Sequence, residues 1–351
     1  MPTMADVARR AGVAVSTVSY VLSGARPVSE RTRQRVMAAI AELGYHPNIL
    51  ARGLASKRTR VIALLFPSGT RGLSHDQLEF FSAAAEVASQ RGYALLLWTT
   101  LGGDAEILRL TEEGLVEGLL LMEVRLHDPR VEALKALGYP FAMIGRTECN
   151  DGISYVDFDF EQAIRLCDQY LYELGHRHIA HLIYSPVPIE QSYGPAVRSL
   201  VGARAFCEEA GIPYIIRVSE ADIEATYRAA HELLDSYPSL TAMVFVSDLQ
   251  CAPVMQAIHE RRLRVPEDFS VVSILSSRFA EMMAPPLTAI ELPAVEMGHI
   301  GMELLIRYLE GDECVPTQLV LPPRLVVRQS CSVRTHTELS MQEAKCFQEG
   351  R

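Results

Sequence analysis

The fold of the N-terminal region is determined by Thr3-Met-Ala-Asp-Val-Ala-Arg-Arg-Ala-Gly-Val13 and the adjoining Ala14-Val-Ser-Thr-Val-Ser-Tyr-Val-Leu22. Thr3 and Asp6 occupy the positions of a capping box, so the first part predicts a helix. Gly12 is the turn residue expected after the end of that helix. The second part predicts another short helix.

A third helix is expected over residues 30–43, with Ser29 as its N-cap and Gly44 at its end. The apolar residues of the three helices are spaced to meet in one small core: Val7, Ala8, Val18, Leu22, Val36, Ile40 and Leu43. A helix, a glycine-containing turn and a second short helix are typical of the helix-turn-helix, whose second helix enters the major groove of DNA.

The expected second helix begins with side chains suited to contact with DNA. Small hydroxyl groups can hydrogen-bond phosphates or base edges, an aliphatic residue can contact a thymine methyl group, and a tyrosine can reach either a base or a phosphate. The hydroxyl groups are those of Ser16, Thr17 and Ser19, the aliphatic residue is Val15, and the tyrosine is Tyr20. Because this pattern also occurs in ordinary helical bundles, a second kind of signal is needed.

The charge distribution supplies that signal. The chain has a formal net charge of −10, but residues 1–60 have a local charge of +7, which leaves −17 for residues 61–351. Lys and Arg side chains neutralise phosphates and provide most non-specific affinity for DNA. The basic N-terminal segment is therefore the part expected to bind nucleic acid, although the negative net charge of the whole chain by itself suggests that the protein does not bind it.

The composition of the 351 residues limits the class of protein. With 49% apolar and 22% charged residues, the chain is neither disordered nor collagen-like, and its length predicts two or three folding units. No apolar run approaches the roughly 18 residues of a membrane span, and no signal-peptide pattern occurs at the N-terminus. Seven cysteines without a Cys-x-x-Cys spacing fit buried thiols better than disulfides or a zinc site, which predicts a cytoplasmic location.

Beyond residue 60 the chain predicts an α/β body. Residues 48–56 contain helix formers but too little apolar periodicity for an independent helix, so they are expected to fold only against a partner. Apolar strands then alternate with amphipathic helices, which predicts doubly wound parallel sheets arranged as two lobes. The expected strands are 61–66, 93–98, 118–122, 141–144, 179–184, 215–218, 243–246 and 271–275. The expected helices are 76–91, 160–175, 197–211, 223–236 and 295–309, and a strand-like stretch at 318–327 follows them.

Sequence motifs for catalysis or metal binding are missing. No G-x-G-x-x-G, Walker, H-E-x-x-H or G-x-S-x-G pattern occurs, so no enzyme activity and no cofactor are expected. His176, His178 and His181 are close together in the sequence, but they lie between a helix end and a strand. Strand positions point to different faces, so these histidines favour a structural role over a metal site.

Several motifs, in order along the chain, resemble the lac repressor/galactose repressor (LacI/GalR) family. In the N-terminal region they are Met4-Ala-Asp-Val-Ala-Arg-Arg-Ala-Gly-Val13, Ser16-Thr-Val-Ser-Tyr-Val-Leu22, Val28-Ser-Glu-Arg-Thr-Arg33, Glu42-Leu-Gly-Tyr-His-Pro-Asn48 and Ala51-Arg-Gly-Leu-Ala-Ser-Lys57. In the body they are Gly175-His-Arg177, Phe245-Val-Ser-Asp248, Pro266-Glu-Asp-Phe-Ser-Val-Val272 and Pro285-Pro-Leu-Thr288. The resemblance extends from about residue 3 to residue 331.

The resemblance implies a homodimeric transcriptional regulator, in most cases a repressor, that binds a near-palindromic operator and has a periplasmic-binding-protein-like body. The implied domains are 1–47 for DNA binding, 48–60 for a hinge helix, 61–331 for effector binding, and 332–351 for a flexible tail. Within the body, one lobe comprises about 61–159 and 292–320, and the other comprises about 160–291 and 321–331. Besides the helix residues above, the implied DNA contacts are Met4, Ser29 and Tyr45, with Asn48, Ala51 and the wedge residue Leu54 in the minor groove.

The sequence departs from the family pattern at four positions. Ala14 stands where Ser is usual, and Tyr20 stands where Arg is common, so a familiar operator sequence is not transferred. Ser199 and Leu275 stand where sugar- and purine-binding members have Arg and Asp. Without those groups a buried array of sugar hydroxyls lacks partners, so the expected effector is not a conventional monosaccharide.

The effector is expected between the lobes, at the carboxyl ends of the parallel strands. The candidate contacts are Pro67, Ser68, Asp76, Phe80, Met122, Glu123, Arg146, Tyr193, Arg198, Asp248 and Leu275. Two other classes stay open at this point. One is a solute-binding protein with the same body and no operator, and the other is an enzyme that uses the cleft between the lobes.

Overall fold

The computed structural model describes residues 2–23, 26–45, 59–66, 73–99, 107, 109, 111–112, 114–220, 222–312 and 315–334. The chain divides into two compact units, an N-terminal one that extends to Val61 and a larger one from Ile62 onward; the first also contains Glu117. In the part of the chain that is described, no helix is long and apolar enough to cross a membrane.

The N-terminal unit contains three helices, α1 (Met4–Ala11), α2 (Val15–Ser23) and α3 (Glu30–Leu43). The capping box of α1 is confirmed, because the Asp6 amide donates to Thr3 Oγ1 and the Thr3 amide donates to the Asp6 carboxylate. Gly12 ends α1 in the left-handed conformation, with φ 60°. Ser29 caps α3 by accepting from the Thr32 amide.

The core of this unit contains all seven apolar residues that the sequence placed there, joined by Ala11, Val21, Ala39 and Tyr45. Each predicted cap or turn signal acts within about three residues of its helix end. Such local signals are independent of the rest of the fold, which is why the sequence sufficed to locate these helices.

The larger unit contains two six-stranded sheets, one in each lobe. The first has the order β11-β5-β4-β3-β1-β2 and consists of β1 (Val61–Phe66), β2 (Ala94–Thr99), β3 (Gly118–Leu121), β4 (Phe141–Ile144), β5 (Tyr155–Phe158) and β11 (Gln318–Leu321). The second has the order β12-β10-β9-β8-β6-β7 and consists of β6 (Ile179–Ser185), β7 (Ile215–Glu220), β8 (Ala242–Phe245), β9 (Ser270–Leu275), β10 (Thr288–Glu291) and β12 (Leu325–Val326). The parallel two-lobed body expected from the sequence is therefore confirmed.

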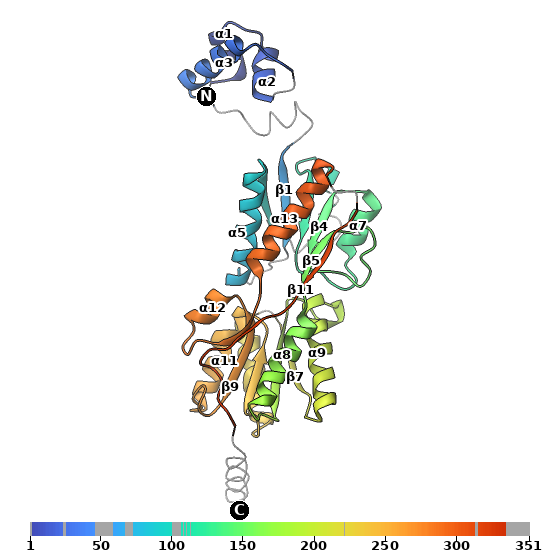
Figure 1. The fold of residues 1–351 in the computed structure, drawn as a ribbon, viewed down its shortest axis with the longest axis vertical. Helices are drawn as coiled ribbons and strands as arrows, with labels where there is room; N and C mark the ends of the chain where they lie inside the picture. The colour runs from blue at the N-terminus through green and yellow to red at the C-terminus, as the bar shows by residue number, and fades with distance from the viewer. Residues whose placement is uncertain are drawn as a thin grey trace, which may run out of the picture. The chain divides into compact units, whose positions relative to one another are not determined.

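Helices cover both sheets (Figure 1). In the first lobe, α5 (His75–Gln90) packs along α13 (Ala294–Glu310), and α7 (Pro129–Leu137) lies nearer β4. The second lobe contains α8 (Phe160–Glu173), α9 (Gly194–Ala210), α10 (Ile223–Ser236), α11 (Asp248–Glu260) and α12 (Ser277–Met282), with a 3-10 turn at Ile189–Gln191. Gly298 permits the close approach of α13 to α5, because a Cβ there would lie 2.6 Å from the Phe80 carbonyl oxygen.

The structure differs from the sequence prediction in several elements. Two buried four-residue strands, β5 and β10, and the helices α7, α11 and α12 were not expected. The stretch 318–327 was expected as one strand, but it forms β11 in one sheet and β12 in the other. Pro322 and Pro323 lie between these two strands, and because proline has no amide hydrogen they interrupt strand pairing there.

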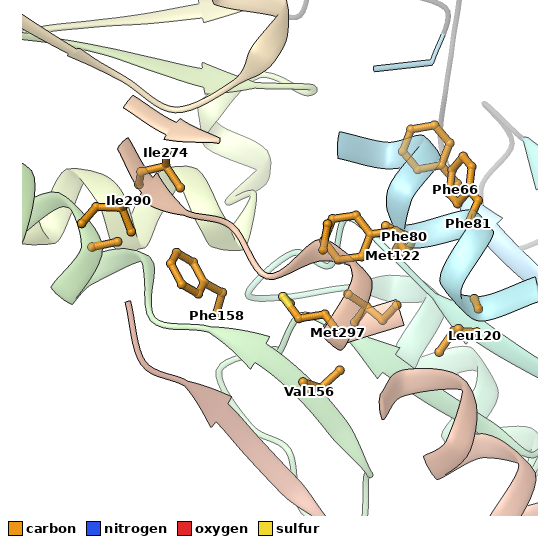
Figure 2. Close-up of a cluster of buried hydrophobic side chains, with 14 of the residues drawn as sticks. Phe66, Phe80, Phe81, Leu120, Met122, Val156, Phe158, Ile274, Ile290 and Met297 are labelled. Carbon is orange, nitrogen blue, oxygen red and sulfur yellow. The ribbon is translucent and has the colours of Figure 1, made fainter. Parts of the chain in front are cut away.

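One hydrophobic cluster extends through both lobes. Its members include Phe66 and Leu120 from the first sheet and Ile274 and Ile290 from the second (Figure 2). Phe158, at the end of β5, is fully buried within the same cluster. The two lobes therefore share apolar packing where the chain crosses from β5 to α8 and from β10 to α13.

Candidate functional site

The start of α2 presents a mixed polar and apolar surface. Val15 is 47% exposed and Ser16 is also exposed, whereas Thr17, Ser19 and Tyr20 are half-buried. The Arg26 guanidinium lies over the Tyr20 ring, 5.3 Å from its centroid. This arrangement brings the candidate residues of α2 together on one short helix, as a major-groove reader requires.

The remaining DNA-contact candidates have different surroundings. Met4 packs partly buried against the core of the N-terminal unit. Tyr45 is buried in that core, so little of its side chain is exposed for contact with a phosphate. Ser29 is exposed at the start of α3, where its hydroxyl also lies 2.9 Å from Thr32 Oγ1. Asn48, Ala51 and Leu54 lie outside the described residues.

A cavity of about 110 Å³ lies between the two lobes. Of the effector candidates, six line it: Asp76, Phe80, Met122, Glu123, Tyr193 and Asp248. Pro67 and Ser68 lie outside the described residues. Glu123 adopts a left-handed backbone conformation, with φ 51°, shortly after β3 ends, a strained position of the kind that gathers at binding sites.

Three other candidates do not line the cavity. Leu275 is fully buried in the second lobe's own hydrophobic cluster. Its place at the end of β9 led to the expectation, but alternate side chains of a strand point to opposite faces. Arg146 and Arg198 lie behind the wall instead, where the Arg198 guanidinium donates to the carbonyl oxygens of Arg146 and Thr147.

Asp157 is the wall residue that these two arginines approach. Its Oδ2 atom lies 3.3 Å from Arg146 Nε and 3.9 Å from Arg198 Nη1. Burial raises the pKa of Asp157 to about 6, and the two arginines oppose that shift. Sequence reasoning missed Asp157 because it is the third residue of the buried strand β5; a lone Asp within an apolar strand was the available signal.

Two carboxylates connect the lobes at the edge of the cavity, and we call Asp76 and Asp248 the interlobe carboxylate pair. Asp248, the first residue of α11, accepts through Oδ2 from the amides of His75 at 2.6 Å and Asp76 at 3.4 Å, in the first turn of α5. Asp76 accepts through Oδ1 from the Ser276 amide at 3.1 Å, just before α12. Each lobe thus supplies a carboxylate to the start of a helix in the other lobe, where amide hydrogens have no helical partner.

The proximity of the two carboxylates affects the pKa of Asp76. Burial and the charge of Asp248 together raise the pKa of Asp76 to about 7, and the hydrogen bonds with Ser276 oppose that shift.

Backbone hydrogen bonds supply a second connection between the lobes. The Leu126 amide donates to the Ser192 carbonyl oxygen at 2.8 Å, and the Gly194 amide donates to the Val124 carbonyl oxygen at 3.1 Å.

Two of the three histidines that the sequence singled out, His176 and His181, are buried and have protein partners. His176 Nδ1 lies 2.8 Å from Thr241 Oγ1, and burial lowers the pKa of His176 to about 4. His181 is fully buried with its Nε2 atom 2.7 Å from Asp168; burial lowers its pKa, but the Asp168 carboxylate outweighs that effect and the net shift is upward. Among the described residues, the structure brings His75, Asp76 and Glu79 together, with their ligand atoms within 4.8 Å of one another, which is close enough for a metal ion.

A helix-turn-helix unit joined to a two-lobed α/β body with a cavity between the lobes defines a ligand-responsive DNA-binding protein. Residues 3–48 match the family described as bacterial regulatory proteins, lacI family, and residues 169–331 match the periplasmic binding protein-like domain. The chain belongs to the lacI family of bacterial regulatory proteins and is a DNA-binding transcriptional regulator.

Relatives are similar over nearly the whole chain. The HTH-type transcriptional regulator CelR of Thermobifida fusca is 34% identical, over 94% of this chain and 98% of its own length. The ribose operon repressor of Escherichia coli K12 is 32% identical, over 94% of this chain and 100% of its own length.

Two solved structures are similar over the same extent. The lac repressor dimer bound to operator and the anti-inducer ONPF aligns with a TM-score of 0.80 at 28% identity, covering 94% of this chain and 99% of that one. The CelR–cellobiose complex aligns with a TM-score of 0.69 at 32% identity, covering 94% of this chain and 100% of that one.

Proposed function

We propose that this chain is a repressor that binds a near-palindromic operator as a homodimer and that a small molecule in the interlobe cavity changes its DNA affinity. The observation that supports this most directly is the combination, in one chain, of a basic helix-turn-helix unit with a cavity between two lobes. A reader with one recognition helix per chain needs two copies to match two half-sites. In this proposal the protein acts in the cytoplasm and catalyses no reaction.

DNA recognition in this proposal has two parts. Residues 1–47 read the major groove through the start of α2, and residues 48–60 form a hinge helix that inserts Leu54 into the minor groove. An apolar side chain inserted between base steps bends DNA and makes the contact sensitive to sequence. The regulator therefore needs both parts for specific binding, whereas phosphate attraction alone provides non-specific binding.

Effector control depends on the body. The candidate contacts that line the cavity come from both lobes, with Asp76 and Phe80 in one and Tyr193 and Asp248 in the other. A ligand bound there contacts both lobes at once and changes the free-energy difference between their closed and open arrangements. We propose 61–331 as the effector-binding body on this basis, with 332–351 as a flexible tail.

Fluorescence anisotropy with DNA from the upstream region of its own gene tests the proposal. The full chain should bind in a salt-sensitive, sequence-selective manner. Ser16→Ala should weaken specific binding by about 5- to 100-fold, as expected for a lost base or phosphate contact. Leu54→Ala should lower specific affinity and leave non-specific affinity nearly unchanged.

Ser236→Ala is the matched control, because it removes an exposed serine hydroxyl from the end of α10, in the body. It should bind operator like the parent chain. Binding without sequence selectivity, or unchanged specific affinity in both Ser16→Ala and Leu54→Ala, contradicts the proposal. A rise in melting temperature with glucose or galactose contradicts the expectation that common monosaccharides are not effectors.

A further inference from the structure

The polar side chains in the cavity wall are carboxylates and neutral groups, and the neutral ones come from Ser74, Gln77, Tyr184, Tyr193 and Ser247. Four carboxylates line the cavity, from Asp76, Glu123, Asp157 and Asp248. No Lys, Arg or His side chain lines it among the residues that the structure describes. A site with this composition suits a ligand group that donates hydrogen bonds and bears positive charge.

Neighbouring groups offset the negative charges of the four carboxylates to different degrees. Asp157 is approached by two arginines, and Asp248 accepts backbone hydrogen bonds from α5 in the other lobe. Glu123 Oε1 accepts from Gln77 Nε2 at 3.1 Å, which is a neutral donor. Asp76, at the end of the cavity formed by the start of α5, lies beside a second acidic group, Asp248, whose charge raises the pKa of Asp76.

Asp76 lies at that end. Its side chain is buried, with the residue 6% exposed, and it lines the cavity. Oδ1 accepts from the Ser276 amide at 3.1 Å, which is a neutral donor. The charged groups that face Asp76 are His75 and Glu79 on α5, which lie with it in one cluster, and Asp248 on α11. A buried carboxylate with acidic neighbours is costly without a positive charge beside it, and a cationic ligand supplies that charge.

The rest of the wall is mainly apolar. Aromatic and aliphatic side chains from both lobes contribute to it: Phe80, Met122, Val124, Ile144, Phe160, Val246, Leu292 and Met297. The aromatic face of Phe80 is compatible with a neighbouring ammonium group through cation–π attraction.

We propose that the effector is a small amine, with its ammonium group at Asp76 and an apolar body against the wall of Phe80, Phe160 and Met297. This inference rests on the proposed function, because it names the class of ligand for the same cavity. The volume limits the body. The cavity measures about 110 Å³, and a cavity of about 150 Å³ holds benzene, so a body of a few carbon atoms fits the arrangement seen here.

Matched compounds that differ only in the polar group provide the test. Butylamine, 1-butanol and butanoate are compared on the full chain by thermal shift and calorimetry, and the set is repeated with cyclopentylamine, cyclopentanol and cyclopentanecarboxylate. The amines should raise the melting temperature, and the alcohols and acids should not. Because the pKa of Asp76 is raised to about 7, amine binding near pH 7 should release protons, seen as a heat that depends on the ionisation enthalpy of the buffer.

Asp76→Asn should weaken amine binding by about tenfold or more, since it removes the charge and keeps the shape. Glu123→Gln provides a second variant with a smaller loss, in case Asp76→Asn does not fold. Asp222→Asn is the control, because Asp222 caps α10 within the second lobe, away from the lining residues. It should bind amines like the parent chain.

Several results overturn the inference. They are stabilisation by alcohols or acids and not by amines, no stabilisation by any amine, and equal amine affinity in Asp76→Asn and the parent chain. Stabilisation by Zn²⁺ or Mn²⁺ that EDTA reverses, with no effect of amines, assigns His75, Asp76 and Glu79 to a metal ion instead and also overturns it. Operator binding by the ligand-free chain is measured separately: its loss contradicts the proposed function, and its presence without amine binding contradicts only this inference.

Discussion

Asp248→Asn is expected to loosen the connection between the two lobes. Asp248 Oδ2 accepts from the amides of His75 and Asp76 in the other lobe, while Oδ1 accepts from the Leu249 amide and the Ser247 hydroxyl in its own lobe. Asparagine keeps one carbonyl acceptor of similar shape but removes the negative charge. The variant therefore weakens the interlobe bonds and leaves a local acceptor in place.

The size of the effect follows from the kind of hydrogen bond that is lost. A hydrogen bond to a charged group contributes about 1.5–3 kcal/mol, and a neutral one contributes about 0.5–1.5 kcal/mol. A charge at a helix N-terminus adds about 0.3–1 kcal/mol, and relief of the repulsion between Asp76 and Asp248 opposes these losses. We expect the closed arrangement to lose about 1–2 kcal/mol, which is roughly a 5- to 30-fold change in the equilibrium between closed and open lobes.

Hydrogen exchange at the start of α5 measures this change directly. The amides of His75 and Asp76 have no partner within α5, so the slow exchange expected for them depends on Asp248. Their protection should fall by about the same 5- to 30-fold factor. The Gln77 amide is an internal reference, because it donates to Ser74 Oγ in the same lobe. Asp222→Asn should leave all three amides unchanged, and unchanged protection of His75 and Asp76 in Asp248→Asn would refute the reasoning.

Three further variants or conditions test the packing and the buried groups. Gly202→Ala would place a Cβ against the Glu161 carbonyl oxygen between α9 and α8, so it should lower the free energy of unfolding by about 1–3 kcal/mol in urea titrations, while Val201→Ala on the exposed side of α9 should have little effect. His176 is buried as the neutral form with a pKa of about 4, so the unfolded chain binds its proton first as the pH falls from about 6.5, and stability should decrease by up to about 3 kcal/mol between pH 6.5 and 4. Urea titrations across that range should show a smaller decrease in His176→Gln, and an equal decrease would contradict the assignment. Thr3→Ala should destabilise α1 by about 1 kcal/mol, seen as faster amide exchange in that helix, and unchanged exchange would argue against the capping box.

The sequence was most informative where signals are local. The caps at Thr3 and Ser29 and the turn at Gly12 each act within a few residues, and all three are confirmed. In the body, long amphipathic helices such as α5 and α13 were located because their period extends over several turns. The strands β5 and β10 were missed because polar residues interrupt them, Asp157 in β5 and Thr288 and Glu291 in β10, whereas the equally short β4 is a continuous apolar run. Pro253 lies inside α11 and breaks the pattern by which that helix could have been recognised.

The candidate site was predictable in position but not in detail. Parallel strands end at one edge of each sheet, so the rule that ligands bind there located Glu123 and Asp248. The rule does not say to which face a side chain points, and Leu275 therefore proved to be a core residue. Asp157 required the three-dimensional arrangement, since β5 brings it to the cavity from within a strand.

The same carboxylates join the lobes and line the cavity, which determines the sign of the coupling between ligand and closure. In the arrangement seen here, Asp76 and Asp248 face each other, and their repulsion opposes closure. A cation between the lobes reduces that repulsion and binds the closed arrangement more tightly, which by itself shifts the lobes toward closure. Asp76→Asn removes the same repulsion without a ligand but also weakens the interlobe bond from the Ser276 amide, so the protection of the His75 amide should change less than in Asp248→Asn, where it should decrease. Equal changes of the same sign in the two variants would show that repulsion within the pair does not oppose closure.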